Sequence, residues 1–194
     1  MKTKNYFTLS TFKIICFAML LLFGACKDKS ATAQQSTLSS KVKAPTIDIH
    51  TAVVTGNVEA LKQHVATGTN INEKDPYGGS SPLISAALFG KTEMTKILID
   101  AGADLNFQNN DGSTALHTAA FFCRPEIVKL LLDKKVDKAL KNKYNSTAYE
   151  SVAGAFGDVK STYEMMEKML GPMGLKLDFA YVEKTRPVIA AMLR

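Results

Sequence analysis

Residues Gly79–Gln108 read GSSPLISAALFGKTEMTKILIDAGADLNFQ, and the same pattern returns 33 residues later. Residues Gly112–Lys141 read GSTALHTAAFFCRPEIVKLLLDKKVDKALK. Ser81-Pro82-Leu83 then aligns with Thr114-Ala115-Leu116, and Ala86-Ala87 aligns with Ala119-Ala120. A period of this length is typical of stacked structural repeats rather than of a single globular core. Each copy holds two short helical patterns followed by an extended, turn-like finger.

Two segments within these copies carry a family resemblance. TALHTAA at residues 114–120 and GADLN at residues 102–106 resemble the ankyrin repeat, whose signature joins a T-P-L-H-x-A opening to a closing G-A-D-V-N. The resemblance covers roughly residues 46–170 and is most specific in the two central copies. It implies an all-α fold, a solenoid of about four helix-turn-helix repeats with finger-like β-turn loops and a C-terminal helical cap. It also implies binding to other proteins.

The pattern weakens outward from the central copies. A first repeat, from about Thr46 to Asp75, lacks the T-P-L-H opening, which fits an N-terminal capping repeat. A fourth repeat is expected over 145–170, where Tyr149 replaces the usual Leu. After the break at Gly171–Gly174, residues 185–193 look like the opening helix of an unfinished fifth repeat. We therefore expect a repeat domain over 46–170 and a C-terminal capping helix within 171–194.

The N-terminal segment is typical of an exported protein. A basic stretch ending at Lys13 precedes ten apolar residues, Ile14–Phe23, which are too few to span a bilayer as a helix. Residues 1–25 are therefore predicted to be a secretory signal peptide. The following Gly24-Ala25-Cys26 resembles a bacterial lipobox, which implies cleavage before Cys26 and lipidation of its thiol. An incidental cysteine after an ordinary cleavage site is the alternative. The polar residues 26–45 are predicted to be a flexible tether.

Charge and motifs exclude several function classes. The formal net charge is +6, but Lys2, Lys4 and Lys13 lie in the leader, which leaves 21 basic and 18 acidic residues. That balance does not predict a nucleic-acid surface. No phosphate-binding glycine loop occurs, and the three histidines have no metal-ligand spacing. We expect no cofactor, no metal, no catalytic residue and no small-molecule substrate.

Local rules explain several repeat positions. The hydroxyls of Ser81 and Thr114 are expected to cap the first helix of their repeats, and Pro82 suits a first helical position. Six apolar residues are expected to fill the space between repeats: Leu83, Ile97, Leu98, Leu116, Leu130 and Leu131. Gly102 suits the left-handed residue that ends a helix. The third repeat has Lys135 there, which predicts a strained or a re-routed exit.

The histidines and Cys123 are residues that can have either a structural or a chemical role. His117 lies in the TALH position, where the resemblance implies a structural role bridging backbone and hydroxyl groups between repeats. His50 is given the same role in repeat one. Cys123 occupies the turn at which Gly56 and Gly90 lie in other repeats, next to Arg124. A neighbouring cation could lower the thiol pKa, so a thiol or redox role is the alternative to a small side chain at a tight turn.

The resemblance places ligand-facing positions at the finger tips and at the end of the first helix of each repeat. Carried over onto this chain, these positions form the predicted partner-binding set: Tyr77, Ser80, Leu88, Phe89, Asn110, Asp111, Ser113, Phe121, Phe122, Lys143 and Tyr144. Aromatic residues are common anchors of protein interfaces. Packing between repeats is the alternative for Phe89 and Phe122.

Together these features predict a non-catalytic protein-interaction module. It is expected to be exported, to be lipid-anchored at the bacterial cell envelope facing the periplasm or the cell surface, and to be a monomer. It would bind a protein partner through its concave face and fingers, as an inhibitor or a helper of an envelope protein. A thiol-handling protein that uses Cys123 and a structural envelope spacer are the alternatives.

Overall fold

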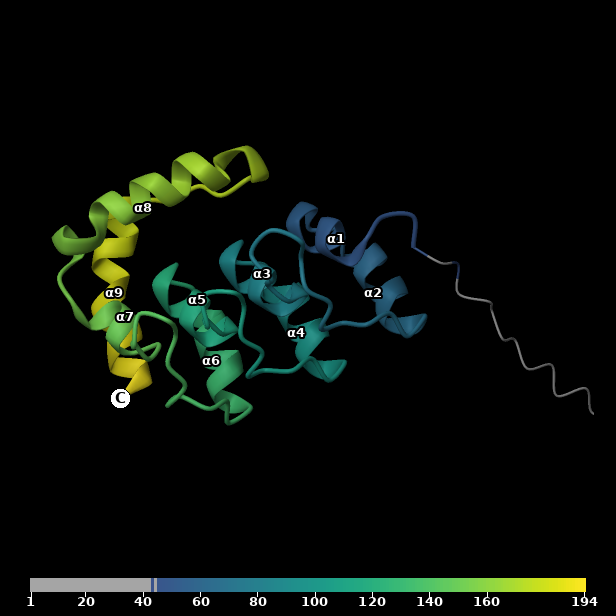
Figure 1. Ribbon diagram of the computed structural model, residues 1–194, viewed down its shortest axis with the longest axis horizontal. Coiled ribbons are helices and arrows are strands. Elements are labelled where there is room, and N and C mark those ends of the chain that lie inside the picture. Colours follow the sequence, from purple (N-terminus) through teal and green to yellow (C-terminus); the bar gives the residue numbers. More distant parts are fainter. Residues whose placement is uncertain (1–42, 44) are drawn as a thin grey trace, which may run out of the picture. The chain divides into compact units, whose positions relative to one another are not determined.

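The computed structural model describes residues 43 and 45–194, and Figure 1 shows the arrangement of their helices. Three helix pairs follow one another along the chain: α1 (Ile49–Thr55) with α2 (Val58–Ala66), α3 (Pro82–Leu88) with α4 (Thr92–Asp100), and α5 (Ala115–Phe121) with α6 (Pro125–Asp133). They are followed by α7 (Glu150–Ala153), α8 (Phe156–Leu170), the short 3-10 helix η1 (Gly171–Met173) and α9 (Phe179–Leu193). The described residues contain no β-strand. This arrangement confirms the all-α repeat solenoid.

The first helix of each repeat begins at a side-chain cap. Asp48, Ser81 and Thr114 each accept a hydrogen bond from the backbone N–H three residues later, and Pro82 occupies the first turn of α3. Such caps satisfy a donor that the helix itself leaves unpaired. The two hydroxyl caps predicted from the sequence are confirmed.

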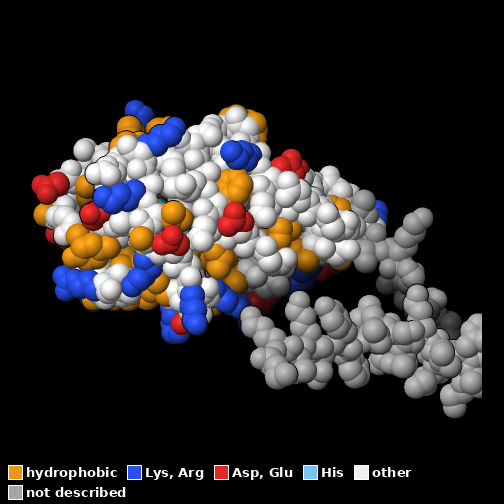
Figure 2. Space-filling model, turned by 60° about the horizontal axis from the view of Figure 1, so that its bottom comes forward, with side chains coloured by type: hydrophobic (Ala, Val, Ile, Leu, Met, Phe, Trp, Pro, Cys, Tyr) orange, Lys and Arg blue, Asp and Glu red, His pale blue; other side chains and the backbone are white. Residues whose placement is uncertain are grey.

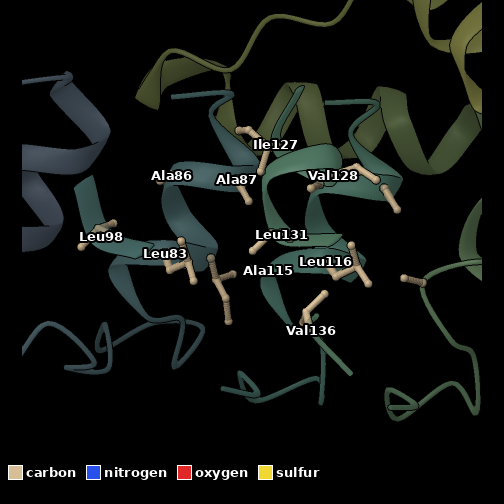
Figure 3. Close-up of a cluster of buried hydrophobic side chains, with 14 of the residues drawn as sticks. Leu83, Ala86, Ala87, Leu98, Ala115, Leu116, Ile127, Val128, Leu131 and Val136 are labelled. Carbon is tan, nitrogen blue, oxygen red and sulfur yellow. The ribbon is translucent and has the colours of Figure 1, made fainter. Parts of the chain in front are cut away.

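The repeats stack through two rows of helices. The first helices α1, α3 and α5 pack against one another, and the second helices α2, α4 and α6 do the same. Between them, Leu83, Leu98, Leu116 and Leu131 are at most 1% exposed, and Figure 3 shows them among the paired alanines of α3. Alanine lets two helices approach closely, whereas leucine fills the remaining volume. One hydrophobic core therefore runs through all repeats.

Left-handed residues end the helices at equivalent places. Gly68 and Gly102 have φ values of 73° and 86° after α2 and α4, and Lys135 has φ 57° after α6. The strained exit predicted at Lys135 is confirmed. A residue with a Cβ pays about 1–2 kcal/mol for this conformation, because its side chain approaches the following carbonyl oxygen.

The C-terminal end differs from the expected arrangement. The chain is extended at Gly154 and Ala155, and α8 then lies away from the second-helix row. Instead α9 packs against α5, α6 and α7, and its Ile189, Ala190 and Leu193 join the main core. The reason is composition: α9 ends in the continuous apolar run PVIAAML at residues 187–193, whereas charged residues are spread along the whole of α8. The helix next to α6 is therefore α9, not the segment 156–170.

The predicted signal peptide and Cys26 lie within residues 1–42, which are outside the described residues. Among the helices that the structure does describe, none combines the length and the apolar character needed to cross a bilayer.

Candidate interaction surface

Three finger tips are built in the same way. Asp75, Asn109 and Asn142 each use a side-chain oxygen to accept hydrogen bonds from backbone N–H groups of their own turn. Asp75 Oδ1 accepts from Tyr77 at 2.9 Å, and Asn142 Oδ1 accepts from Tyr144 at 3.0 Å. Asp and Asn stabilise turns in this way because their short side chains reach the backbone two residues on. Each tip is thus held in one conformation.

Neighbouring tips are joined by backbone hydrogen bonds. The N–H of Asn110 donates to the carbonyl of Gly78 at 3.0 Å, and the N–H of Lys143 donates to the carbonyl of Asp111 at 2.9 Å. Gly79 has φ 64°, and a Cβ added there would collide with the Asn110 side chain in its present position. The glycine therefore permits both the turn and the close approach of the next finger. The three tips form one continuous row.

Asp75 is the ionisable member of the three turn residues. Burial raises its pKa, but hydrogen bonds from Gly78, Tyr77 and Ser80 and the nearby His50 outweigh that effect, so the net pKa lies below the ordinary value. A carboxyl with a lowered folded-state pKa contributes stability above its unfolded pKa and loses that contribution as the pH falls through the folded value. The first tip thus depends on a charged carboxylate.

Several residues of the predicted partner-binding set are exposed to solvent on this row of finger tips. Tyr77 is 91% exposed and Tyr144 is 74% exposed, and Asn110, Asp111 and Lys143 between and beside them are also exposed. Ser80 and Ser113 are half-buried. Two unpartnered phenol rings therefore stand at separate tips of a hydrogen-bonded row.

The residues of the predicted partner-binding set that lie at the ends of helices are less exposed to solvent. Leu88 and Phe89 are half-buried at the end of α3, where the Arg124 guanidinium donates to the Leu88 carbonyl at 3.3 Å. Phe122 is only 6% exposed and meets Phe121 edge to face, with ring centroids 5.1 Å apart. The prediction that Phe122 contacts a partner is therefore corrected, because packing already covers its ring.

Helix α8 covers the ring of Phe121. The rings of Phe121 and Tyr163 are stacked with centroids 4.5 Å apart, and the Tyr163 hydroxyl donates to the Phe121 carbonyl at 2.5 Å. The buried Arg186 of α9 in turn donates to the Tyr163 hydroxyl at 2.8 Å. Phe121 is thus half-buried under a neighbouring helix rather than free on a concave face. Only the spacing of Phe156, Val159 and Tyr163 in the sequence hints at a helix face of this kind.

Cys123 lies beneath this contact. It is fully buried, adopts φ 53° at the turn, and its thiol donates to the Val182 carbonyl at 3.6 Å. Burial raises its pKa to about 11, although Arg186 and Arg124 act in the opposite direction. A reactive thiol needs a low pKa and access to solvent. The structure contradicts the thiol-handling alternative, and Cys123 is a small buried side chain at a turn.

The histidines have structural roles. His117 is 4% exposed; its Nδ1 accepts from the Thr114 N–H at 3.3 Å, and its Nε2 lies 3.0 Å from the Ser146 carbonyl oxygen. The bridging role expected of His117 is thus confirmed. His64, which the sequence did not single out, pairs with Thr69 Oγ1 and the Ile47 carbonyl oxygen.

The role assigned to His50 is wrong. Counted from the caps Asp48 and Thr114, His50 shares the column of Leu116 rather than that of His117. Its two ring nitrogens are buried without a hydrogen-bond partner in the described structure. It therefore does not bridge repeats. Within the described residues, no group of three or more His, Cys, Asp or Glu side chains could hold a metal ion.

Comparisons with known proteins agree with this architecture. A family model described as Ankyrin repeats (3 copies) matches residues 49–142. The human protein phosphatase 1 regulatory subunit 27 is 38% identical over 64 residues, which cover 33% of this chain and 41% of that protein. The human DNA-binding protein RFXANK is 36% identical over 58 residues, which cover 30% of this chain and 22% of that protein. The chain thus spans less than half the length of these relatives.

A solved structure is also similar. The crystal structure of the ankyrin repeat domain of Bcl-3, a member of the IkappaB protein family, superposes with a TM-score of 0.52 at 33% sequence identity. The match covers 53% of this chain and 45% of that one. The similarity therefore lies in the repeats.

Proposed function

Because this chain is an ankyrin-repeat protein, and ankyrin repeats mediate protein–protein interactions, we propose that it binds a protein partner through its row of finger tips. The partner would rest against Tyr77 and Tyr144, with the polar tip residues Asn110 and Asp111 between them. The role is non-catalytic, and the partner is an envelope protein that the chain inhibits or assists. The name of one relative, a phosphatase regulatory subunit, is in keeping with a role of this kind.

The exposure of the two tyrosines carries the proposal. A tyrosine that packs within its own chain is usually largely covered, as Tyr163 is, whereas Tyr77 and Tyr144 remain 91% and 74% exposed. Tyrosine is enriched among the residues that dominate binding energy at interfaces. Exposed rings at these positions are therefore suited to contact another molecule.

The rigidity of the row supports the same function. Side-chain hydrogen bonds fix each tip, and backbone hydrogen bonds join successive tips. A surface ordered before binding loses less conformational entropy when the complex forms. A small number of aromatic anchors can therefore be sufficient to bind a partner.

A capture experiment tests this proposal. The soluble part from Lys43 onward, which lies within one compact unit, is immobilised and exposed to envelope extract, and a captured protein is identified by mass spectrometry. Its affinity is then measured for the parent and for a Tyr77→Ala, Tyr144→Ala variant. We expect the double variant to bind at least about tenfold more weakly, since each truncation removes an exposed aromatic anchor.

Tyr181→Ala provides the matched control. Tyr181 is 44% exposed on α9 and does not belong to the finger row, so its loss should leave the affinity unchanged. Equal binding by the parent and the double variant would refute the assigned face. Capture of nothing at all by the parent would favour the structural spacer instead.

We further propose that the chain is exported and anchored through a lipid on Cys26. The support is sequence alone: the apolar run Ile14–Phe23 followed by Gly24-Ala25-Cys26. Cys26→Ser is expected to abolish incorporation of a fatty-acid label and to release the protein from the membrane fraction. Cys123→Ser is the control, because that thiol is buried. Labelling that survives Cys26→Ser would disprove the anchor.

A further inference from the structure

The three fingers differ sharply in charge. Residues 67–80 contain Glu73, Lys74 and Asp75, a net charge of −1, and residues 101–113 contain only Asp104 and Asp111, a net charge of −2. The third finger, residues 134–146, has a net charge of +4. Its charged residues are Lys134, Lys135, Asp137, Lys138, Lys141 and Lys143. The third finger is thus positively charged, whereas the equivalent fingers of the first two repeats are negatively charged.

This charge is concentrated in the third finger. Residues 43–194 hold 18 basic and 17 acidic side chains, a net charge of +1, so the rest of that region is net negative. In Figure 1 the third finger is the connection between α6 and α7 on the lower side. Figure 2 shows Lys and Arg side chains along the lower edge of the face that it draws and others over its upper part. The row of fingers is therefore electrically polarised along its length.

Most of these lysines have no carboxylate partner in the described structure. Lys134 Nζ lies 3.7 Å from Asp100 Oδ1, and it is the only lysine of the finger in an ion pair there. Lys138 Nζ donates to the main-chain oxygens of Leu193 and Arg194, and Lys141 Nζ donates to Asn145 Oδ1 at 3.4 Å. Lys135 and Lys143 are exposed, and their side chains make no hydrogen bond within the described residues. Their charge is directed to solvent.

Two further features mark the finger as a surface for contact. Lys135 has a left-handed backbone conformation, and the equivalent residues of the other two repeats are Gly68 and Gly102. The stability of the backbone alone would therefore favour glycine at position 135. Strained residues of this kind tend to occur at functional positions. The exposed Tyr144 follows Lys143 directly, which places an aromatic anchor beside the uncompensated charge.

From this arrangement we infer that the third finger binds an acidic segment of a protein partner. The inference rests on the proposed function and adds the chemistry of the partner: carboxylates over Lys135, Lys141 and Lys143, with an apolar side chain against Tyr144. Charge complementarity of this kind steers association and fixes the orientation of a complex. The acidic first and second fingers would reject the same segment, so it can bind at one end of the row only.

A peptide experiment tests the inference. The probe is a short fluorescein-labelled peptide in which glutamates alternate with leucines, and binding to residues 43–194 is followed by fluorescence anisotropy. We expect the parent to bind, and a Lys141→Glu, Lys143→Glu variant to bind about tenfold more weakly. Raising the salt from about 50 mM to about 500 mM should weaken binding to the parent, because exposed charges are screened.

The controls separate charge at the finger from charge in general. Lys62→Glu, Lys168→Glu changes two exposed lysines on α2 and α8 by the same charge and should leave the affinity within about twofold, since both helices lie away from the connection between α6 and α7 in Figure 1. A peptide with glutamine in place of glutamate should not bind. No binding of the acidic peptide, equal loss in both lysine variants, or tighter binding of a single-stranded oligonucleotide than of the peptide would each overturn the inference.

The native partner distinguishes this inference from the proposed function. If Tyr77→Ala, Tyr144→Ala weakens its binding and Lys141→Glu, Lys143→Glu does not, the finger row is the binding face and the acidic segment is refuted. If neither variant weakens it, both proposals fail. If both variants weaken the binding of the native partner, both proposals are supported.

Discussion

Replacing Tyr163 with alanine is expected to lower the free energy of unfolding by about 3–5 kcal/mol, the range for truncating a buried aromatic ring. The ring is fully buried, stacks on Phe121, and joins α8 to α5 and α9 through its hydroxyl. Burial raises the pKa of that hydroxyl to about 12, so it remains a donor at neutral pH. Urea unfolding of residues 43–194 measures the loss.

Cys123 provides a second readout of the same change. Tyr163, Val182 and Cys123 form one buried cluster, so removal of the phenol ring should open a path to the thiol. We expect the parent to react slowly with a thiol reagent under native conditions and Tyr163→Ala to react much faster, because exposure of the thiol also relieves the burial that raises its pKa. In residues 43–194 Cys123 is the single cysteine, so the signal is unambiguous.

Two variants separate the causes. Tyr163→Phe keeps the ring stack and removes the hydroxyl, which leaves Arg186 without one acceptor and should cost about 1–3 kcal/mol. Tyr181→Ala deletes an exposed phenol and should change stability by less than about 0.5 kcal/mol. If Tyr163→Ala retained the stability of the parent, α8 would not be fixed to the repeats as the structure shows.

Loss of His117 is the second large effect that we expect. His117→Ala removes the side chain that links the Thr114 cap to the Ser146 carbonyl of the following finger. The buried Thr114 N–H would lose its acceptor, whereas the Ser146 carbonyl would keep the hydrogen bond from the Asn142 N–H. The unpaired N–H and the cavity left by the ring together should lower the free energy of unfolding by about 2–4 kcal/mol. Thermal and urea unfolding measure the change.

The same side chain should make stability depend on pH. Burial lowers the pKa of His117, although its hydrogen bonds to Ser146 and Leu140 oppose this shift. Nδ1 accepts the Thr114 N–H, so a proton added there would place two donors face to face. The unfolded chain therefore binds the proton first, and stability should fall as the pH is lowered from about 6.5 through the folded pKa.

The matched control for this slope is His117→Gln. It removes the titrating ring and should flatten the dependence of the free energy of unfolding on pH below neutrality. A parent whose stability did not change over this range would show that His117 is not buried in its neutral form.

Local signals were enough to predict the repeats and their fingers. The 33-residue period, the caps Ser81 and Thr114, and the left-handed exit at Lys135 depend on neighbours within a few positions, so the residues themselves report them. The predicted tip residues Tyr77 and Tyr144 are exposed for the same reason, since turn chemistry at Asp75 and Asn142 fixes where each tip projects. The off-by-one assignment of His50 arose where the first repeat lacks the opening motif.

Contacts between distant parts of the chain were decided by tertiary structure alone. Tyr163 lies 42 residues from Phe121, yet its ring stacks there, and Arg186 reaches the same hydroxyl from α9. No repeat pattern encodes this contact, because α8 does not pack in either row of repeat helices. The sequence thus determined the repeat unit and its surface loops through short-range rules. The packing of α8 and α9 determined that the ring of Phe121 is covered rather than exposed.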